Sequence, residues 1–175
     1  MIGGTSPGID INYNFDDMKV KHKNLTVLWN LHKYAVEMAK NLKANPSELG
    51  ESHELGVEER YIFSRLNSAI KKTTGIFDGY MLNEIPWIAE ELFLDLSRTY
   101  IQLTRDKASM GSEDERKAVL YAVFNVLLET LKLFAPVAPF ITEAMYQNLR
   151  QEFRLKEESI HLFGWPKHNE ELIDD

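Results

Sequence analysis

The chain contains no cysteine among its 175 residues. This absence excludes disulfide bonds and metal sites built on thiolates, and it favours an intracellular protein, for which we expect a cytoplasmic location. The five histidines show no metal-ligand spacing, so no metal site is predicted. The first residues lack the basic and apolar regions of a signal peptide.

Catalytic signatures and membrane spans are also absent from the sequence. There is no Gly-rich phosphate loop, and no spacing suggests a nucleophile paired with a base. The most apolar stretch is too short and too interrupted to cross a bilayer, which needs about 20 uninterrupted apolar residues. We therefore predict no catalytic residue, no cofactor site and no membrane contact for this chain.

The charge balance is acidic, with 20 basic and 27 acidic residues and a net charge of −7. Such a balance argues against broad electrostatic binding to nucleic acid. It still permits a local basic patch, because the position of charges matters more than their total. Apolar residues make up 44% of the chain, which is enough for a sizeable core in a single domain.

The stretch from Ala118 to Phe134 organises the rest of the chain. Apart from Glu129 and Lys132 it is almost entirely uncharged and apolar, and a helix that is apolar nearly all round must be wrapped by other elements. We therefore predict the central helix of a bundle here. Pro136 ends it, and Pro139 fits the first turn of a second helix that runs to about residue 153.

Three more helices are predicted ahead of this corner, at residues 15–43, 58–80 and 84–109. Their apolar residues recur at steps of three and four, which is helical periodicity. Asn14 is a good N-cap for the first helix, and Pro46 stops it. The polar stretch that follows, up to residue 57, is predicted to be a loop.

Several helix positions are assigned to the core from these patterns. Leu127 and Leu131 lie in the most apolar run and are predicted to be buried. His32 lies on an apolar stripe and is interpreted as a core histidine. The side chains expected to face inward on the 84–109 helix are Ile88, Leu92, Leu96, Leu103 and either Thr99 or Tyr100.

The last residues change character and read as an extended segment. Residues 159–166, SIHLFGWP, are short and partly alternating, and Trp165 is expected to pack on the bundle. The prediction is therefore all-α: a helix bundle of about five helices at residues 14–153, with a short extended C-terminal segment at 154–175. An irregular lead-in occupies residues 1–13.

Four stretches of the chain resemble one protein family. The corner LKLFAPVAPFITEAMYQNL looks like the helix–proline–helix corner in the anticodon-binding domain of class I aminoacyl-tRNA synthetases for isoleucine, valine and leucine. RYIFSRLNSAI and LDLSRTYIQLTRDK resemble two helices of that domain. ESIHLFGWPKHNEELID resembles the isoleucyl type most closely. Valyl and leucyl enzymes remain alternatives, and the residues by themselves also allow a non-catalytic helical scaffold that binds a protein.

The resemblance implies a partner and a parent enzyme. The partner would be the anticodon stem-loop of tRNA(Ile), and the opening IGGTSPGIDINYNF resembles the segment after the catalytic loop of isoleucyl enzymes. The chain is therefore expected to begin where the parent's catalytic domain ends, and to contact that domain. ATP and Mg are expected for the parent enzyme. This chain lacks His-Ile-Gly-His and Lys-Met-Ser-Lys-Ser, so we expect it to be inactive alone.

The 84–109 helix carries the first set of candidate RNA-binding residues. Three of them fall at i, i+4 and i+7, which places them on one stripe of a helix. Arginine suits phosphate because its planar fork binds oxygen pairs and stays charged. Salt bridges to Asp95 or Asp106 are the alternative account of the arginines. The set is Arg98, Gln102, Arg105 and, beyond them, Lys107.

The 58–80 helix carries a second candidate set, Arg65, Lys71 and Lys72. Two of them share one face of the helix with an aromatic and a hydroxyl side chain, and such a line of groups could track a phosphate backbone. The four residues of that face, at i, i+4, i+7 and i+11, are Tyr61, Arg65, Ser68 and Lys72. An ordinary polar helix face is the alternative. The lysines near the start of the first helix, such as Lys19, are interpreted as a solvated face.

Overall fold

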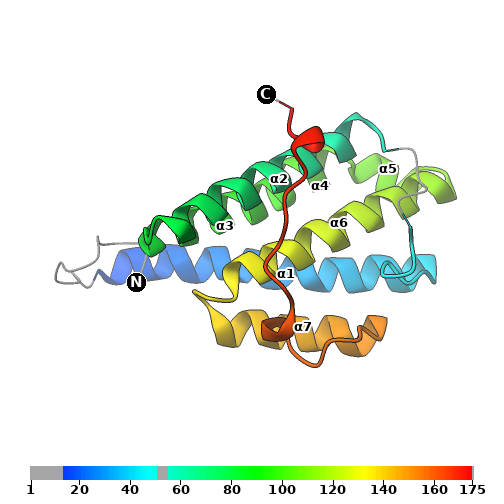
Figure 1. Ribbon diagram of the computed structural model, residues 1–175. Helices are drawn as coiled ribbons and strands as arrows, with labels where there is room; N and C mark the ends of the chain where they lie inside the picture. The colour runs from blue at the N-terminus through cyan, green and yellow to red at the C-terminus, as the bar shows by residue number, and fades with distance from the viewer. Residues whose placement is uncertain (1–13, 51–54, 175) are drawn as a thin grey trace.

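Figure 1 shows a computed structural model of the chain, in which residues 14–50 and 55–174 are described. These residues form helices and connecting loops and contain no strand, which confirms the all-α prediction. The long helices are α1 (Phe15–Leu42), α2 (Val57–Asp78), α6 (Glu113–Phe134) and α7 (Pro139–Phe153). A fifth rod consists of α3 (Ile85–Asp95), the π-helical turn η3 (Leu96–Tyr100), α4 (Ile101–Leu103) and α5 (Arg105–Met110).

Helix α6 is the centre of the bundle, as its apolar sequence predicts. It begins at a capping box in which Ser112 and Glu115 satisfy each other's backbone N–H groups. It packs against α1, α2, α3, α5 and α7. Leu127 and Leu131 are both 0% exposed, which confirms their predicted burial.

The remaining helix ends follow local signals in the sequence. The Asn14 side chain accepts a hydrogen bond from the Asp16 N–H at 2.9 Å, so it caps α1 as predicted. Helix α1 ends at Leu42, one residue before the predicted end, because Lys43 adopts the left-handed conformation at φ 50°. Pro139 opens α7, where its missing N–H leaves no bond unmade.

The rod from Ile85 to Met110 differs from the continuous helix that the sequence predicts. In the π turn the Ile101 N–H bonds to the Leu96 carbonyl, five residues back instead of four. The extra residue shifts the inward face of the rod by one position. Thr104 is therefore 1% exposed, whereas Leu103, which was assigned to the core, is 62% exposed.

Residues 154–174, the C-terminal strap, cross the bundle from the end of α7 over α6 to α2 (Figure 1). Tyr146 Oη donates to the Glu157 carbonyl at 2.7 Å where the strap starts. Trp165 Nε1 donates to Thr74 Oγ1 at 2.9 Å, and its ring packs on Phe77 with centroids 4.7 Å apart. Near the end, the Asn169 N–H donates to Asn67 Oδ1 at 2.7 Å. The strap contains two short 3-10 turns, η4 (Ile160–Leu162) and η5 (Glu170–Leu172).

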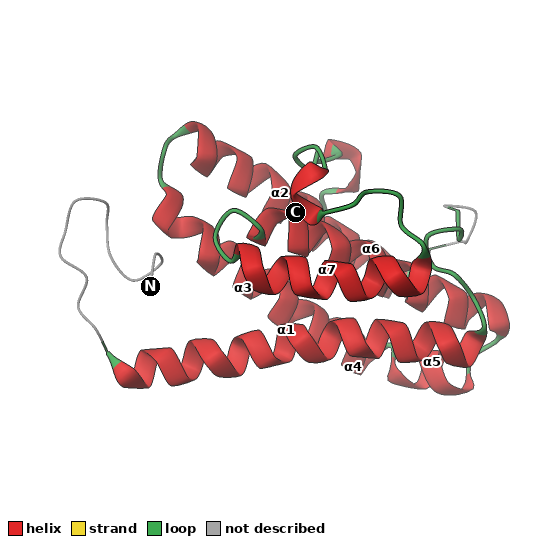
Figure 2. Ribbon diagram, turned by 90° about the horizontal axis from the view of Figure 1, so that it is seen from below, coloured by secondary structure: helices red, strands yellow, loops and turns green. Residues whose placement is uncertain are grey.

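Helix α1 runs along one side of the bundle beside α7 (Figure 2). His32 lies on its inner face and is buried, as predicted. Its Nε2 lies 3.2 Å from the Asn148 amide nitrogen, while Nδ1 has no hydrogen-bond partner in the described part of the chain. Burial lowers the pKa of His32, so the folded protein holds the ring neutral.

Truncating the central helix tests its assignment as the core. We expect Leu127→Ala to lower the free energy of unfolding by about 2–5 kcal/mol, because it leaves a cavity at a fully buried site. Leu103→Ala, at an exposed site on the π-containing rod, should change it by less than about 0.5 kcal/mol. Urea unfolding of both variants measures the difference. Equal effects would mean that α6 is placed wrongly.

The pH dependence of stability tests the burial of His32. Because its pKa is lower in the folded state than the ordinary 6.5, the unfolded chain binds the proton more readily. Its contribution is complete above pH 6.5 and is lost as the pH falls towards the lowered pKa. His32→Gln should therefore lose less stability than the wild type between about pH 7.5 and about pH 5. Urea unfolding at both pH values checks this, and identical losses would contradict it.

Candidate nucleic-acid interface

Three of the four candidate residues on the π-containing rod are exposed to solvent. Arg98 lies in the π turn, Gln102 in α4 and Arg105 at the start of α5. Within residues 14–50 and 55–174, neither arginine forms an ion pair, so the alternative of salt bridges to Asp95 or Asp106 does not apply there. Both residues are exposed, and no carboxylate of the described residues must be displaced before they bind another anion.

Asp95 pairs instead with the second candidate set. Arg65 Nε donates to its Oδ2 at 2.8 Å, and Arg65 also reaches Glu91 at 2.9 Å. The hydrogen bond that Arg65 donates to Asp95 raises the pKa of Arg65. Tyr61 Oη donates to the same Asp95 carboxylate at 2.9 Å, and burial raises the pKa of this phenol. These contacts favour the interpretation of an ordinary, internally paired polar face on α2.

The two lysines of that set differ from each other. Lys71 Nζ lies 3.0 Å from a Glu170 carboxylate oxygen, in an ion pair that joins α2 to the C-terminal strap. Lys72 is exposed and forms no ion pair with any residue that the structure describes. Within the described residues, Lys72 is therefore the one member of the second set that, like Arg98 and Arg105, is in no ion pair.

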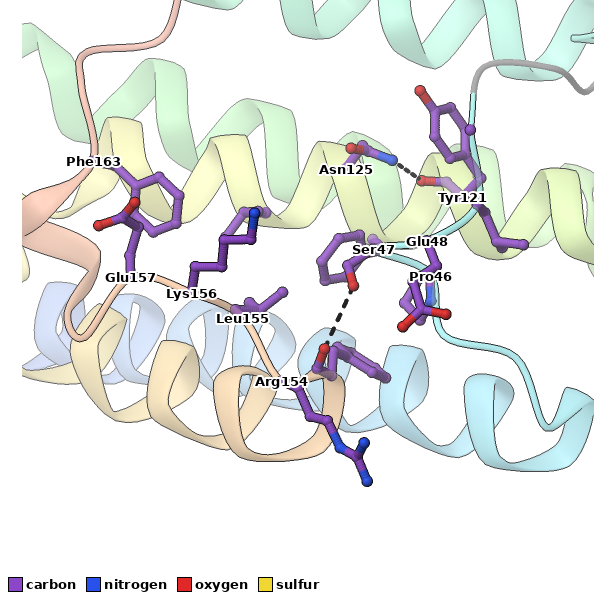
Figure 3. A pocket seen from close by; sticks show the side chains of 15 residues that line it. Pro46, Ser47, Glu48, Tyr121, Asn125, Arg154, Leu155, Lys156, Glu157 and Phe163 are labelled. Atoms are coloured by element: carbon purple, nitrogen blue, oxygen red, sulfur yellow. Dashed lines mark hydrogen bonds between the residues drawn. The ribbon is translucent and has the colours of Figure 1, made fainter.

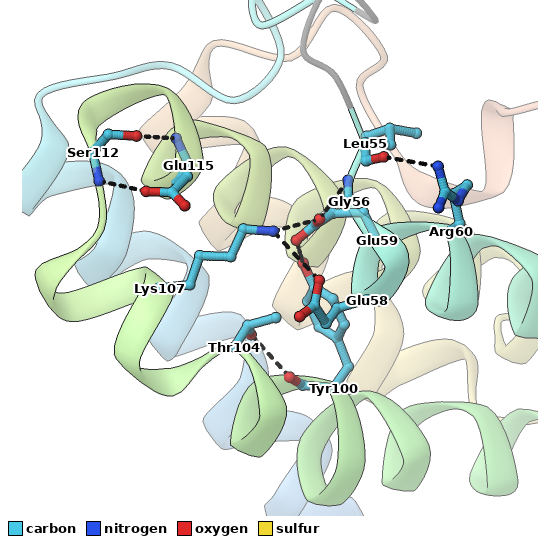
Figure 4. A network of polar contacts seen from close by, with 10 residues as sticks. All are labelled: Leu55, Gly56, Glu58, Glu59, Arg60, Tyr100, Thr104, Lys107, Ser112 and Glu115. Carbon is cyan, nitrogen blue, oxygen red and sulfur yellow. Dashed lines mark hydrogen bonds and ion pairs between the residues drawn. The ribbon is translucent and has the colours of Figure 1, made fainter.

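Lys107 is held inside the protein by a buried carboxylate, as Figure 4 shows. Its Nζ lies 2.6 Å from Oε2 of Glu59, a residue of α2 that is 0% exposed. The same oxygen accepts the Gly56 N–H at 2.9 Å, and Oε1 accepts Tyr100 Oη at 2.9 Å. We call Glu59, Tyr100 and Lys107 the Glu59 cluster. The Lys107 side chain is 19% exposed, so the expectation that it is a surface RNA donor does not fit this geometry.

Tyr100 is the hydrogen-bond donor of this cluster. Burial, followed by the negative charge of Glu59, raises the pKa of its phenol far above the usual value, so the hydroxyl keeps its proton. Glu59 is not among the candidate residues that the sequence predicts. A signal was present, because Glu59 precedes Ile62 and Leu66 by three and seven residues and so lies on the buried stripe of α2.

A groove of about 630 Å³ lies between the loop after α1, helix α6 and the start of the C-terminal strap (Figure 3). Two of its polar side chains bond to backbone nearby: Asn125 donates to the Tyr121 carbonyl at 2.8 Å, and Ser47 Oγ donates to the Phe153 carbonyl at 3.4 Å. The groove is therefore a seam between packed elements.

Exposed apolar side chains gather at the start of α1 and at the connection from α2 to α3. Figure 1 places these two segments at the same end of the bundle. Lys21 joins them, because its Nζ pairs with Glu90 and lies 3.7 Å from the centre of the Trp87 ring. The exposed side chains at this apolar end are Phe15, Met18, Val20, Tyr80, Met81, Leu82 and Trp87.

Two further searches of the structure concern metals and membranes. Across the described ranges, no three His, Asp or Glu side chains are grouped as a metal ion would require. None of the helices in those ranges combines the length and the apolar character that crossing a bilayer demands.

Comparison with known proteins gives consistent matches. Residues 59–175 match the family model for the anticodon-binding domain of tRNA ligase. An isoleucine–tRNA ligase of Methanothrix thermoacetophila is 34% identical over 99% of this chain. The isoleucine–tRNA ligases of Methanosarcina acetivorans and Archaeoglobus fulgidus are each 31% identical, over 99% and 97% of this chain. The chain spans 17% of the length of each of these curated relatives.

Removing Lys107 tests the role of the buried pair. Lys107→Met should lower the free energy of unfolding by about 3 kcal/mol, because it leaves the Glu59 carboxylate buried without its cation. Lys71→Met breaks an exposed ion pair on the same helix bundle and should cost less than about 1 kcal/mol. Urea unfolding of both variants compares them. Equal and small losses would show that Lys107 does not stabilise Glu59.

Proposed function

Since the chain belongs to the anticodon-binding domain family of tRNA ligases, we propose that it binds the anticodon stem-loop of a tRNA. The observation that carries the proposal is the exposed set Arg98, Gln102 and Arg105, whose arginines have no ion-pair partner within the described chain. Charged donors that are already in water and uncommitted can bind phosphate without breaking an internal pair.

Isoleucine is the amino acid that the proposal assigns to the whole ligase. All three of the relatives above are named isoleucine–tRNA ligases, and the stretch ESIHLFGWPKHNEELID points the same way. In the whole enzyme this domain would hold tRNA(Ile) while a catalytic domain of the same protein attaches isoleucine, with ATP and Mg. The valyl and leucyl enzymes remain the alternatives within the family.

Recognition would combine phosphate contacts with stacking, because unpaired loop bases expose flat apolar faces. The arginines supply the phosphate contacts, and the half-exposed Trp87 ring at the start of α3 offers a stacking surface on the same rod. The net charge of −7 repels RNA in general, so affinity must come from these local donors. Binding by the chain alone should be weak and should fall steeply with added salt.

A protein contact is the second candidate function. The apolar end supports it, since a set of exposed large apolar side chains marks a surface that another protein can cover. This function requires no basic stripe and predicts no preference for RNA over other polyanions.

A double substitution on the rod tests the RNA proposal. Changing Arg98 and Arg105 together to Ala should weaken binding to an isoleucine-tRNA anticodon stem-loop by about tenfold or more, because two charge-assisted contacts are lost. Lys19→Ala, which removes a surface lysine of α1 already paired with Asp16, should have a smaller effect. A salt-titrated binding assay measures both, with circular dichroism as the control for folding.

Two outcomes would overturn parts of the proposal. If the double variant binds like the wild type while Lys19→Ala loses affinity, the RNA-facing side is wrong. If neither variant loses affinity and the wild type does not prefer the RNA over heparin, the protein-contact function is favoured.

A further inference from the structure

The rod that carries the candidate RNA donors is broken between them. Arg98 lies in the π turn η3, whereas Arg105 begins α5, and Thr104 separates the two parts with φ −95° and ψ 7°. The Thr104 N–H and its Oγ1 both bond to the Tyr100 carbonyl, at 3.0 and 2.8 Å. Helix α4 ends at Leu103 and α5 begins at Arg105, so the rod consists of two helical parts that meet at Thr104.

Helix α5 packs on α6, and its Ala108 is partly buried against the core. The helix is six residues long, and it contributes no fully buried side chain. Its closest polar attachment to α2 is the Lys107–Glu59 ion pair at 2.6 Å. On the other side of the break, the π turn is attached to the same carboxylate through Tyr100 at 2.9 Å. The Glu59 carboxylate of α2 thus bonds to both parts of the broken rod, to Tyr100 in the π turn and to Lys107 in α5 (Figure 4).

We propose that Glu59 is a positioning residue for RNA binding, which fixes Arg98 and Arg105 relative to each other by holding Tyr100 and Lys107. Each arginine precedes one of these two anchored residues by two positions, so its backbone is fixed where the anchor is fixed. This inference rests on the proposed function. Glu59 is buried and touches no RNA itself.

For Glu59→Gln, the proposal predicts a change in RNA affinity opposite in sign to the change expected from net charge alone. Glu59→Gln removes one negative charge from an acidic protein and releases Lys107 from its ion pair. If charge alone mattered, both changes would strengthen RNA binding. If Glu59 positions the arginines, the substitution weakens binding because α5 is no longer held against α2 in one orientation.

The experiment measures binding of an isoleucine-tRNA anticodon stem-loop to the wild type and five variants over a range of salt concentrations. Glu59→Gln should weaken binding about 5–10-fold, the equivalent of one impaired charge-assisted contact. The affinity should depend less steeply on salt, as in the Arg98→Ala, Arg105→Ala double variant, because binding releases fewer counterions when a phosphate contact is lost. Titration to saturation gives the active fraction, so a partly unfolded sample is recognised by reduced stoichiometry.

A matched control and a combined variant complete the test. Glu152→Gln makes the same charge change and breaks the Lys40–Glu152 pair on α1 and α7, and it should not weaken binding. Adding Glu59→Gln to the double arginine variant should cause no further loss, since a residue that acts only through the arginines has nothing left to position. Tyr100→Phe, which removes one attachment and no charge, should weaken binding in the same direction and replaces Glu59→Gln if that variant does not fold.

The outcomes separate this inference from the proposed function. If the double arginine variant loses affinity while Glu59→Gln and Tyr100→Phe bind as tightly as the wild type or more tightly, RNA binding stands and positioning by Glu59 is refuted. If Glu59→Gln weakens binding equally with and without the arginines, it acts by another route and the inference also fails. If the double arginine variant binds like the wild type, the proposed RNA face and this inference both fall.

Discussion

The burial of α6 is the constraint on which the rest of this structure depends. A helix that is apolar on nearly every side must be covered on nearly every side, and here five other helical segments supply that cover. The demand sets the number of neighbours and their amphipathic character. The strap adds to that cover, because its turn η4 contacts α6 and Lys132 Nζ of α6 lies 4.4 Å from the centre of the Phe163 ring.

Covering one helix with several amphipathic neighbours leaves polar groups at their junctions, and the protein pairs these groups internally. Asp95 accepts hydrogen bonds from Arg65 and Tyr61, and Glu90 accepts them from Lys21 and Asn24. Glu59 accepts hydrogen bonds from Tyr100 and Lys107 of the broken rod. Cationic side chains such as Lys21, Arg65 and Lys107 are held in ion pairs in this way. The proposed RNA face is therefore defined as much by the pairs that remove other candidates as by the arginines that are left.

The fold could be predicted from sequence because its signals are local. Asn14, Ser112 and Pro139 mark helix starts by chemistry that acts within one turn, and the apolar period of Leu127 and Leu131 reports burial directly. The π turn could not be predicted in this way, because one inserted residue changes the phase of the pattern without changing its composition. The burial of Thr104 in place of Leu103 is the visible result.

The candidate site was less predictable because its decisive contacts join distant parts of the chain. Spacing placed Arg98, Gln102 and Arg105 on one side of a helix, and the structure shows all three exposed. Spacing could not show that Lys107 reaches Glu59 across 48 residues, or that Arg65 reaches Asp95 across 30. Such pairs exist only once α2 and the broken rod have docked.

The C-terminal strap imposes an order on the making of this protein. Its bonds to α2 join Asn67 to Asn169 and Ser64 to Asp174, across 102 and 110 residues. In synthesis α2 precedes its partners in the strap, so Asn67 and Ser64 form these bonds only after the strap has been made. Contacts of such sequence separation close slowly because the intervening chain must first be ordered. The contacts of the strap with α2 are therefore expected to form late in folding.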